Sequence, residues 1–126
     1  MTDTSGAEAI PHLLVNTAEL IAASEPEATG AIWNLPVRER DLDSNVIALP
    51  AGHRIEAHLG PDLDVMIHVL DGTGTLLTER DDVPLSAGAL VWLPRRSRRE
   101  IIAGPEGLRY LTVHQRRQAL TLGPTR

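Results

Sequence analysis

The sequence predicts an all-β domain, a sandwich or barrel of short strands, with one short helix in front of it. Short apolar segments recur from Ala31 onward, and most of them end at Pro, Gly or Asp. Nine prolines and ten glycines among 126 residues supply the turns between these segments. No long helical pattern follows Ala31, so a parallel sheet with crossover helices is not expected.

The helix is predicted just before the first strand. Asn16 is a helix-capping residue type, and Glu19 stands three positions later, at the reciprocal position of a capping box. Leu20 and Ile21 continue the pattern, and Pro26 stops it after about two turns. We therefore expect one short helix that packs on the domain or covers part of it.

The strands are predicted from short apolar or alternating runs bounded by turn-forming residues. Asp71-Gly72 is a strong hairpin signal. We expect an N-terminal arm with the helix over residues 1–30, a barrel over 31–117 and a flexible tail over 118–126. The expected strands cover 31–35, 45–49, 54–59, 65–70, 75–79, 90–93, 100–103 and 108–114.

Composition excludes several classes of function. The chain has no cysteine, which excludes disulfides, thiolate nucleophiles and Cys-ligated metals. It also has no lysine, which excludes Schiff-base catalysis by a lysine side chain. A net charge of −5 and 2% aromatic residues argue against nucleic-acid and anionic-membrane partners. The N-terminus lacks the pattern of a signal peptide and no apolar run reaches membrane-spanning length, so a cytoplasmic protein is expected.

Two spaced motifs are the most informative feature of the chain. Residues 52–72 read GHRIEAHLGPDLDVMIHVLDG, and residues 88–103 read GALVWLPRRSRREIIA. They resemble the two motifs of the cupin superfamily, G-x5-H-x-H-x(3,4)-E-x6-G and G-x5-P-x-G-x2-H-x3-N. The matching residues are Gly52, His58, Gly72, Gly88 and Pro94.

The resemblance covers residues 31–114 and implies a cupin jelly-roll barrel, a double-stranded antiparallel β-helix with a ligand site in its mouth. The segment from Pro94 to Arg99 and the ending from Tyr110 to His114 look similar to those of small single-domain bacterial cupins. Both the strand pattern and the motif spacing thus indicate the same architecture.

Most metal-ligand places of the motifs are degenerate in this chain. Cupins gather three His and one Glu around a divalent transition metal such as Fe, Ni or Zn. Here only His58 keeps its place, while Gly60, Val65 and Arg99 stand at the other three. Arg96 and Ala103 replace the Gly and Asn of the second motif. The resemblance therefore favours the fold more strongly than the metal chemistry.

Strand alternation predicts which side chains face the interior. If His58 points inward, as the resemblance implies, Glu56 and Arg54 share its face. Because Val65 stands at the Glu place of the first motif, the resemblance also implies that Val65, Ile67 and Val69 point inward on the next strand. Arg99, Ile101 and Ala103 would share a face in the second motif. The outward row, Met66, His68 and Leu70, is largely apolar and needs a cover. Either the N-terminal segment or a second subunit can provide it, and a homodimer is the simpler expectation.

Three hypotheses for function follow. The first is a metal-free cupin that binds a small polar or anionic molecule through His58, Arg99, Glu56 and Asp64. The second is a metal-dependent oxygenase or isomerase with a non-standard ligand set of His58, His114 and Glu56 or Asp64. The third is a dimerising structural module with a filled barrel, in which Arg99 pairs internally, for example with Glu56. The facing of His114 and the question of whether any reaction is catalysed stay open.

Overall fold

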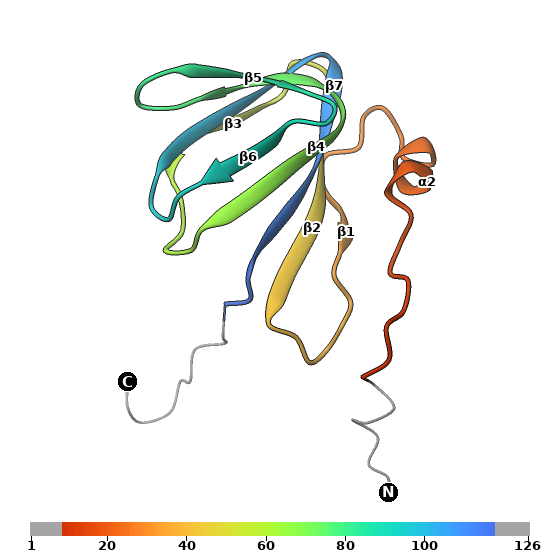
Figure 1. Ribbon diagram of the computed structural model, residues 1–126. Helices are drawn as coiled ribbons and strands as arrows, with labels where there is room; N and C mark the ends of the chain where they lie inside the picture. Colours follow the sequence, from red (N-terminus) through yellow and green to blue (C-terminus); the bar gives the residue numbers. More distant parts are fainter. Residues whose placement is uncertain (1–8, 118–126) are drawn as a thin grey trace, which may run out of the picture.

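The computed structural model describes residues 9–117. The expected tail over 118–126 lies outside this range, as do residues 1–8 of the expected N-terminal arm. One helix and seven strands form the described part (Figure 1). They are α2 (Thr17–Ala22), β1 (Gly30–Asn34), β2 (Leu42–Leu49), β3 (Arg54–Leu59), β4 (Val65–Leu77), β5 (Asp82–Ser86), β6 (Leu90–Leu93) and β7 (Arg98–Gln115).

The predicted fold class and the predicted helix are confirmed. All strand pairs are antiparallel. Asn16 caps α2 because its side-chain oxygen accepts a hydrogen bond from the Glu19 backbone N–H at 3.0 Å. Within residues 9–117 the structure contains no helix of the length and apolarity that a membrane crossing requires.

Two long bent strands organise the barrel. The first half of β4 pairs with β6 and with the second half of β7, whereas its second half pairs with β5 and with the first half of β7. One layer is therefore formed by β1, β2, β6 and the adjoining halves of β4 and β7. The other layer is formed by β3, β5 and the remaining halves. The two layers face each other as in a jelly roll.

The expected hairpin at Asp71-Gly72 is wrong, because β4 continues through it with register shifts on either side. Gly72 has a φ of +84°, and a Cβ added there would collide with the carbonyl oxygen of Gly107 on β7. Gly72 therefore allows β4 to bend and lets the backbone of Gly107 approach closely, and the chain does not reverse there. The expected break at Gly104-Pro105 is likewise absent, since β7 runs through it.

Strand β5 was not expected because Pro84 interrupts its apolar pattern. It lies at the edge of its layer and pairs only with β4, where a residue without an N–H is tolerated. The short strand β5 forms the edge of the layer that also contains β3.

The core lies between the two layers, as the alternation predicted. Val65, Ile67 and Val69 are buried on β4, with at most 7% of their surface exposed. Ile101 and Ala103 are buried on the facing layer, and all five belong to one apolar cluster. Met66 and His68, between them in sequence, are exposed on the outer face.

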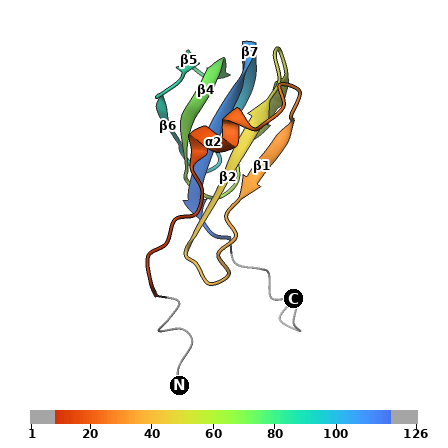
Figure 2. The same cartoon turned by 90° about the vertical axis from the view of Figure 1, so that its right-hand side faces the viewer.

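The N-terminal segment covers part of the outer face of the β2–β7–β4 layer. Figure 2 shows α2 lying across this layer. Val46 and Ala48 of β2 are fully buried although they lie outside the core cluster. Arg109, also buried, donates a hydrogen bond from Nη2 to the Glu25 carbonyl oxygen at 2.9 Å and so ties the segment after α2 to β7.

Candidate ligand site at the barrel mouth

The barrel mouth is the end of the barrel where the end of β3 meets the turn between β6 and β7. Two backbone hydrogen bonds join them: Gly60 N–H donates to the Ser97 carbonyl at 2.9 Å, and Arg96 N–H donates to the Pro61 carbonyl at 2.8 Å. His58 is the register partner of Arg99. The structure therefore brings together three of the four positions that the cupin motifs assign to metal ligands, which are occupied here by His58, Gly60 and Arg99.

Arg99 fills the space that a side chain at position 60 would need. A Cβ built on Gly60 would overlap the Arg99 guanidinium. Both residues are buried, and Arg99 is only 5% exposed. Gly60 and Arg99 stand at two of the histidine places of the motifs. They fit together because the Arg99 guanidinium occupies the volume that a side chain at position 60 would fill.

The acceptors of the Arg99 guanidinium all come from the turn before its own strand. Nε donates to the Ser97 carbonyl at 3.2 Å, and Nη2 donates to the Pro94 carbonyl at 2.9 Å and to Ser97 Oγ at 2.7 Å. Among residues 9–117, no carboxylate forms an ion pair with Arg99 and no acceptor is bonded to its Nη1. Burial lowers the pKa of Arg99 because desolvation disfavours the cation.

The expectation that Arg54 and Glu56 share the inner face of His58 is corrected by an irregularity in β3. Arg54 pairs with Ile102 and Ile55 with Ile101, but the register shifts before His58. Because Ile101 is an inner residue, Ile55 is inner too, and Arg54 lies on the outer side, where it forms an ion pair with Glu100 at 2.8 Å.

His58 and Glu56 are both exposed, so neither is enclosed by the barrel. The Nδ1 of His58 lies 2.9 Å from the Glu56 carbonyl oxygen, a contact that orients the imidazole ring. No ion pair joins Glu56 to Arg99 within the described chain, so the expected internal pair is replaced by the carbonyl acceptors of the turn.

Asp64 lies at the rim of the mouth and is engaged by Arg95. It accepts a hydrogen bond from the Arg95 backbone N–H at 2.9 Å and one from Arg95 Nη2 at 3.4 Å. The backbone bond first, then the side-chain bond, holds the pKa of the Asp64 carboxyl below its usual range. Asp64 and Arg95 also line a surface pocket of about 290 Å³ that includes His114.

The structure settles the facing of the last strand. His114 pairs with Val65, Thr112 with Ile67 and Tyr110 with Val69, so these three β7 side chains share the inner face. His114 and Thr112 are only half-buried, whereas Tyr110 is 4% exposed. Sequence reasoning missed Tyr110 and Thr112. Their alternation with apolar residues was visible, but nothing local fixed which set faced inward.

Tyr110 brings a weakly acidic hydroxyl into this interior. Burial raises its pKa to about 12, since the phenolate would be poorly solvated there. Thr112 Oγ1 is held by Asn45, whose backbone N–H donates to it at 3.1 Å. A neutral phenol and a threonine hydroxyl therefore lie on the inner face, beyond the charged residues of the mouth.

The residues present do not fit the metal centre that the cupin motifs imply. Within the described residues, no group of three or more His, Asp or Glu side chains gathers where a metal ion could be held. At the four motif places only His58 is a donor, and a cationic guanidinium lies at one of the others. His114 lies opposite Val65 and its Nδ1 contacts the Gln115 carbonyl at 2.8 Å. The alternative set of His58, His114 and Glu56 is therefore not assembled.

Solved structures, several of them of cupin proteins, resemble this chain. A cupin-2 domain protein of Shewanella frigidimarina aligns with a TM-score of 0.63 and 16% identity over 82% of this chain and 95% of that one. A protein of Bacillus halodurans aligns with a TM-score of 0.70 and 13% identity over 89% and 86%. A cupin 2 conserved barrel domain protein of Salinispora arenicola gives 0.58 and 20% over 65% and 71%.

No protein-family profile matches the sequence, and no curated protein matches it either. At the identities found, the structural likeness establishes the fold and leaves activity to be argued from the site. The chain has the cupin fold, and the predicted jelly-roll barrel is confirmed.

Proposed function

We propose that this cupin-fold protein binds a small polar or anionic cytoplasmic metabolite at its barrel mouth, without a metal ion. The observation that carries the proposal is the environment of Arg99. Its guanidinium is buried, yet its acceptors are two carbonyl oxygens and a hydroxyl, all neutral. A buried charge without a counter-ion is costly, and a carboxylate or phosphate is the natural complement of an arginine.

The arrangement around Arg99 supports a ligand that enters from the mouth. Nη1 has no bonded acceptor within residues 9–117, and exposed His58 lies opposite in the register. A small carboxylate can accept one hydrogen bond from Nη1 of Arg99 and another from a ring N–H of His58.

Asp64 and Glu56, the other two residues predicted to bind the ligand, have supporting positions in this proposal. Asp64 is already bonded to Arg95, so it balances charge at the rim and would not contact an anion directly. Glu56 contributes its carbonyl oxygen to the orientation of His58. The proposed contacts are therefore reduced to Arg99 and His58.

The two competing hypotheses have weaker support. A metal-dependent oxygenase or isomerase needs a ligand set that the described residues do not gather. A filled structural barrel does not account for Arg99, whose buried guanidinium has only neutral acceptors within residues 9–117. Binding at the mouth is the function that accounts for Arg99 with the fewest further assumptions.

Calorimetric titration with phosphate, acetate, oxalate and 2-oxoglutarate tests the proposal. At least one anion should bind the wild-type chain, and Arg99→Gln should weaken that binding at least about tenfold, as the loss of a charge-assisted hydrogen bond predicts. Arg98→Gln is the matched control, because Arg98 is the exposed neighbour on the same strand. Equal binding by both variants would refute the role of Arg99.

Elemental analysis of tag-free protein tests the metal-free part. After exposure to iron, nickel and zinc salts and removal of excess metal, the chain should retain well below one equivalent. Near-stoichiometric metal that disappears in His58→Ala would overturn the proposal in favour of the metal-dependent alternative.

A further inference from the structure

The hydrogen bonds of the Arg99 guanidinium decide which of its nitrogens a ligand can use. Nε donates to the Ser97 carbonyl at 3.2 Å, and Nη2 donates both to the Pro94 carbonyl at 2.9 Å and to Ser97 Oγ at 2.7 Å. A guanidinium binds a carboxylate through two parallel hydrogen bonds, either from Nε and Nη2 or from Nη2 and Nη1. Because Nη2 is needed in both arrangements and both of its N–H groups are engaged, Arg99 presents only Nη1 to a ligand.

The backbone around the mouth fixes the acceptors of Arg99. The Ser97 carbonyl also accepts a hydrogen bond from the Gly60 N–H at 2.9 Å, and the Pro94 carbonyl also accepts one from the Ser97 N–H at 3.1 Å. Each of these oxygens therefore accepts two hydrogen bonds, its full capacity. Since Arg99 is only 5% exposed, its guanidinium has little room to turn, and a ligand meets it in this orientation.

His58, the register partner of Arg99, presents the opposite kind of group. Its Nδ1 lies 2.9 Å from the Glu56 carbonyl oxygen. A carbonyl oxygen can only accept, so Nδ1 carries the ring proton, and in the neutral imidazole Nε2 is then an acceptor. A carboxylate can accept a hydrogen bond from Nε2 only when the ring is an imidazolium. The neutral ring requires a donor on the ligand instead.

We infer that the ligand at the mouth is a hydroxy carboxylate. One carboxylate oxygen accepts from Nη1 of Arg99, and the hydroxyl donates to Nε2 of His58. The inference rests on the proposed binding function and names its ligand class. Opposed side chains of an antiparallel pair have Cβ atoms about 5 Å apart, so one small molecule reaches both residues. A hydroxyl on the carbon next to the carboxylate places the donor beside the acceptor oxygen, as the two residues require.

An α-amino acid also carries a donor next to its carboxylate, but it complements Arg99 less well. Within residues 9–117 the buried guanidinium has only neutral acceptors, so a ligand with a net negative charge offsets its charge. A zwitterion brings no net charge and places an ammonium group close to the guanidinium, where the two cations repel each other. The site is therefore expected to distinguish a hydroxyl from an ammonium on the same carbon skeleton.

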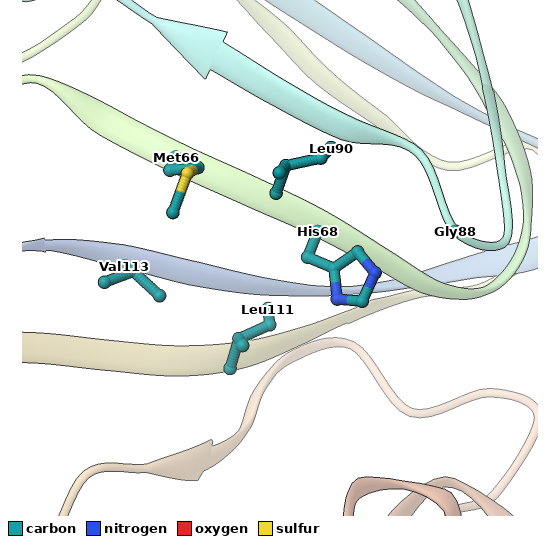
Figure 3. A pocket seen from close by; sticks show the side chains of 6 residues that line it. All are labelled: Met66, His68, Gly88, Leu90, Leu111 and Val113. Atoms are coloured by element: carbon teal, nitrogen blue, oxygen red, sulfur yellow. The ribbon is translucent and has the colours of Figure 1, made fainter.

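His68 provides a contrast on the outer face of the barrel. Figure 3 shows its imidazole in a groove of about 330 Å³, beside the apolar side chains of Met66, Leu90, Leu111 and Val113. None of the described residues that line this groove is an arginine, so it has no cation for a carboxylate. His68 is exposed, as the histidine at the mouth is, and it therefore serves as the matched control.

Calorimetric titration of the full chain with glycolate, acetate, methoxyacetate and glycine tests the ligand class. The titrations are made at about pH 8, where an ordinary imidazole is neutral. Glycolate should bind about fivefold more tightly than acetate, as one additional hydrogen bond predicts. Methoxyacetate lacks the O–H donor and should bind no better than acetate, and glycine should bind more weakly than glycolate. A glycolate affinity no higher than that of acetate, methoxyacetate or glycine would overturn the inference.

His58→Ala identifies the group that recognises the hydroxyl. The preference for glycolate over acetate should disappear in His58→Ala and persist in His68→Ala. A purely structural role of His58 would weaken both ligands alike and leave the ratio of their affinities unchanged, which would also overturn the inference. If another anion binds through Arg99 and glycolate is not preferred, the proposed function stands and the ligand class is wrong. If no anion binds, both fail.

Discussion

Arg99 and Arg109 are two buried arginines on β7 that differ in the range of their hydrogen bonds. Both are at most 7% exposed, and both bond to oxygens that carry no charge. Arg109 donates to the carbonyls of Leu49, Leu108 and Glu25, which belong to three separate segments. Arg99 donates only to Pro94 and Ser97, within five residues of itself.

The difference separates a structural brace from the arginine that we propose to bind a ligand. Arg109 joins β2, β7 and the N-terminal segment through hydrogen bonds of 3.4, 3.3 and 2.9 Å, and its buried Nε has no hydrogen-bond partner within the described chain. Arg99 is held by its own turn and keeps Nη1 without a bonded acceptor. A guanidinium that is fixed locally can be directed at a ligand without the rest of the fold depending on it.

Arg109→Ala should have the largest effect on stability. It leaves three carbonyl oxygens without their donor and opens a cavity under the N-terminal segment. We expect a loss of about 3 kcal/mol in the free energy of unfolding, measured by urea denaturation. Arg99→Ala should cost clearly less, because only local acceptors lose their donor.

Arg109→Met serves as the control for volume, since it keeps most of the side-chain bulk and removes only the hydrogen bonds. If both Arg109 variants lose less than about 1 kcal/mol, then the cost of desolvating the guanidinium offsets its bonds and Arg109 is no brace.

Tyr110 follows Arg109 on β7 and tests whether the inner face, on which Arg99 lies, is dry. Its pKa is raised to about 12, so the folded chain holds the phenolic proton where the unfolded chain releases it. This contribution is fully present below pH 10 and is lost as the pH rises from about 10 to 12, with a change of about 3 kcal/mol.

The measurement is the difference in unfolding free energy between wild type and Tyr110→Phe across alkaline pH. The chain has one tyrosine, so tyrosinate absorbance reports Tyr110 alone. An absorbance midpoint near pH 10 in the folded protein would mean that water reaches the phenol and that the interior is open as far as Val69.

Gly60→Ala tests the coupling between the mouth and Arg99. The added Cβ overlaps the guanidinium, so either the side chain moves or the end of β3 does. We expect a loss of about 2 kcal/mol in the wild-type background and close to none in Arg99→Ala, a coupling measurable in a double-mutant cycle. Additive losses would show that the guanidinium moves aside freely and is not fixed at the mouth.

The sequence predicts the layers of this barrel better than its bends. The motif place of Val65, combined with the alternation of side chains along a strand, correctly put Val65, Ile67 and Val69 in the core. The dipeptide Asp71-Gly72 is compatible both with a hairpin turn and with a bend in a continuous strand. The close approach of Gly107 on β7 favours the bend. This contact joins residues far apart in the sequence, so the local sequence around Gly72 does not predict it.

The sequence predicted which residues lie at the candidate site, but it did not predict the hydrogen bonds and ion pairs that these residues form. The motif spacing brought His58 and Arg99 together, as the structure also does. The irregularity before His58 removed Arg54 from the inner face, and the acceptors of Arg99 came from its own turn instead of Glu56. Contacts of this kind depend on the local path of the backbone, which side-chain alternation does not describe.

Arg96 offers the smallest and most local test of how far the second motif has diverged. It stands at the glycine place of the motif and has a φ of +57°, the only positive φ at a non-glycine residue within 9–117. The Ser97 N–H donates to the Pro94 carbonyl at 3.1 Å, so Arg96 is the third residue of a turn that favours glycine there.

Arg96→Gly should therefore stabilise the chain by about 0.5 kcal/mol. Relief of left-handed strain slightly outweighs the extra freedom that glycine has in the unfolded chain, and the exposed pair with Asp62 contributes little. Thermal and urea unfolding measure the change, with Arg95→Gly, expected to destabilise, as the control at the preceding turn position. A clear loss of stability in Arg96→Gly would mean that its side chain, rather than its backbone, holds the turn against Asp62 and keeps the acceptors of Arg99 in place.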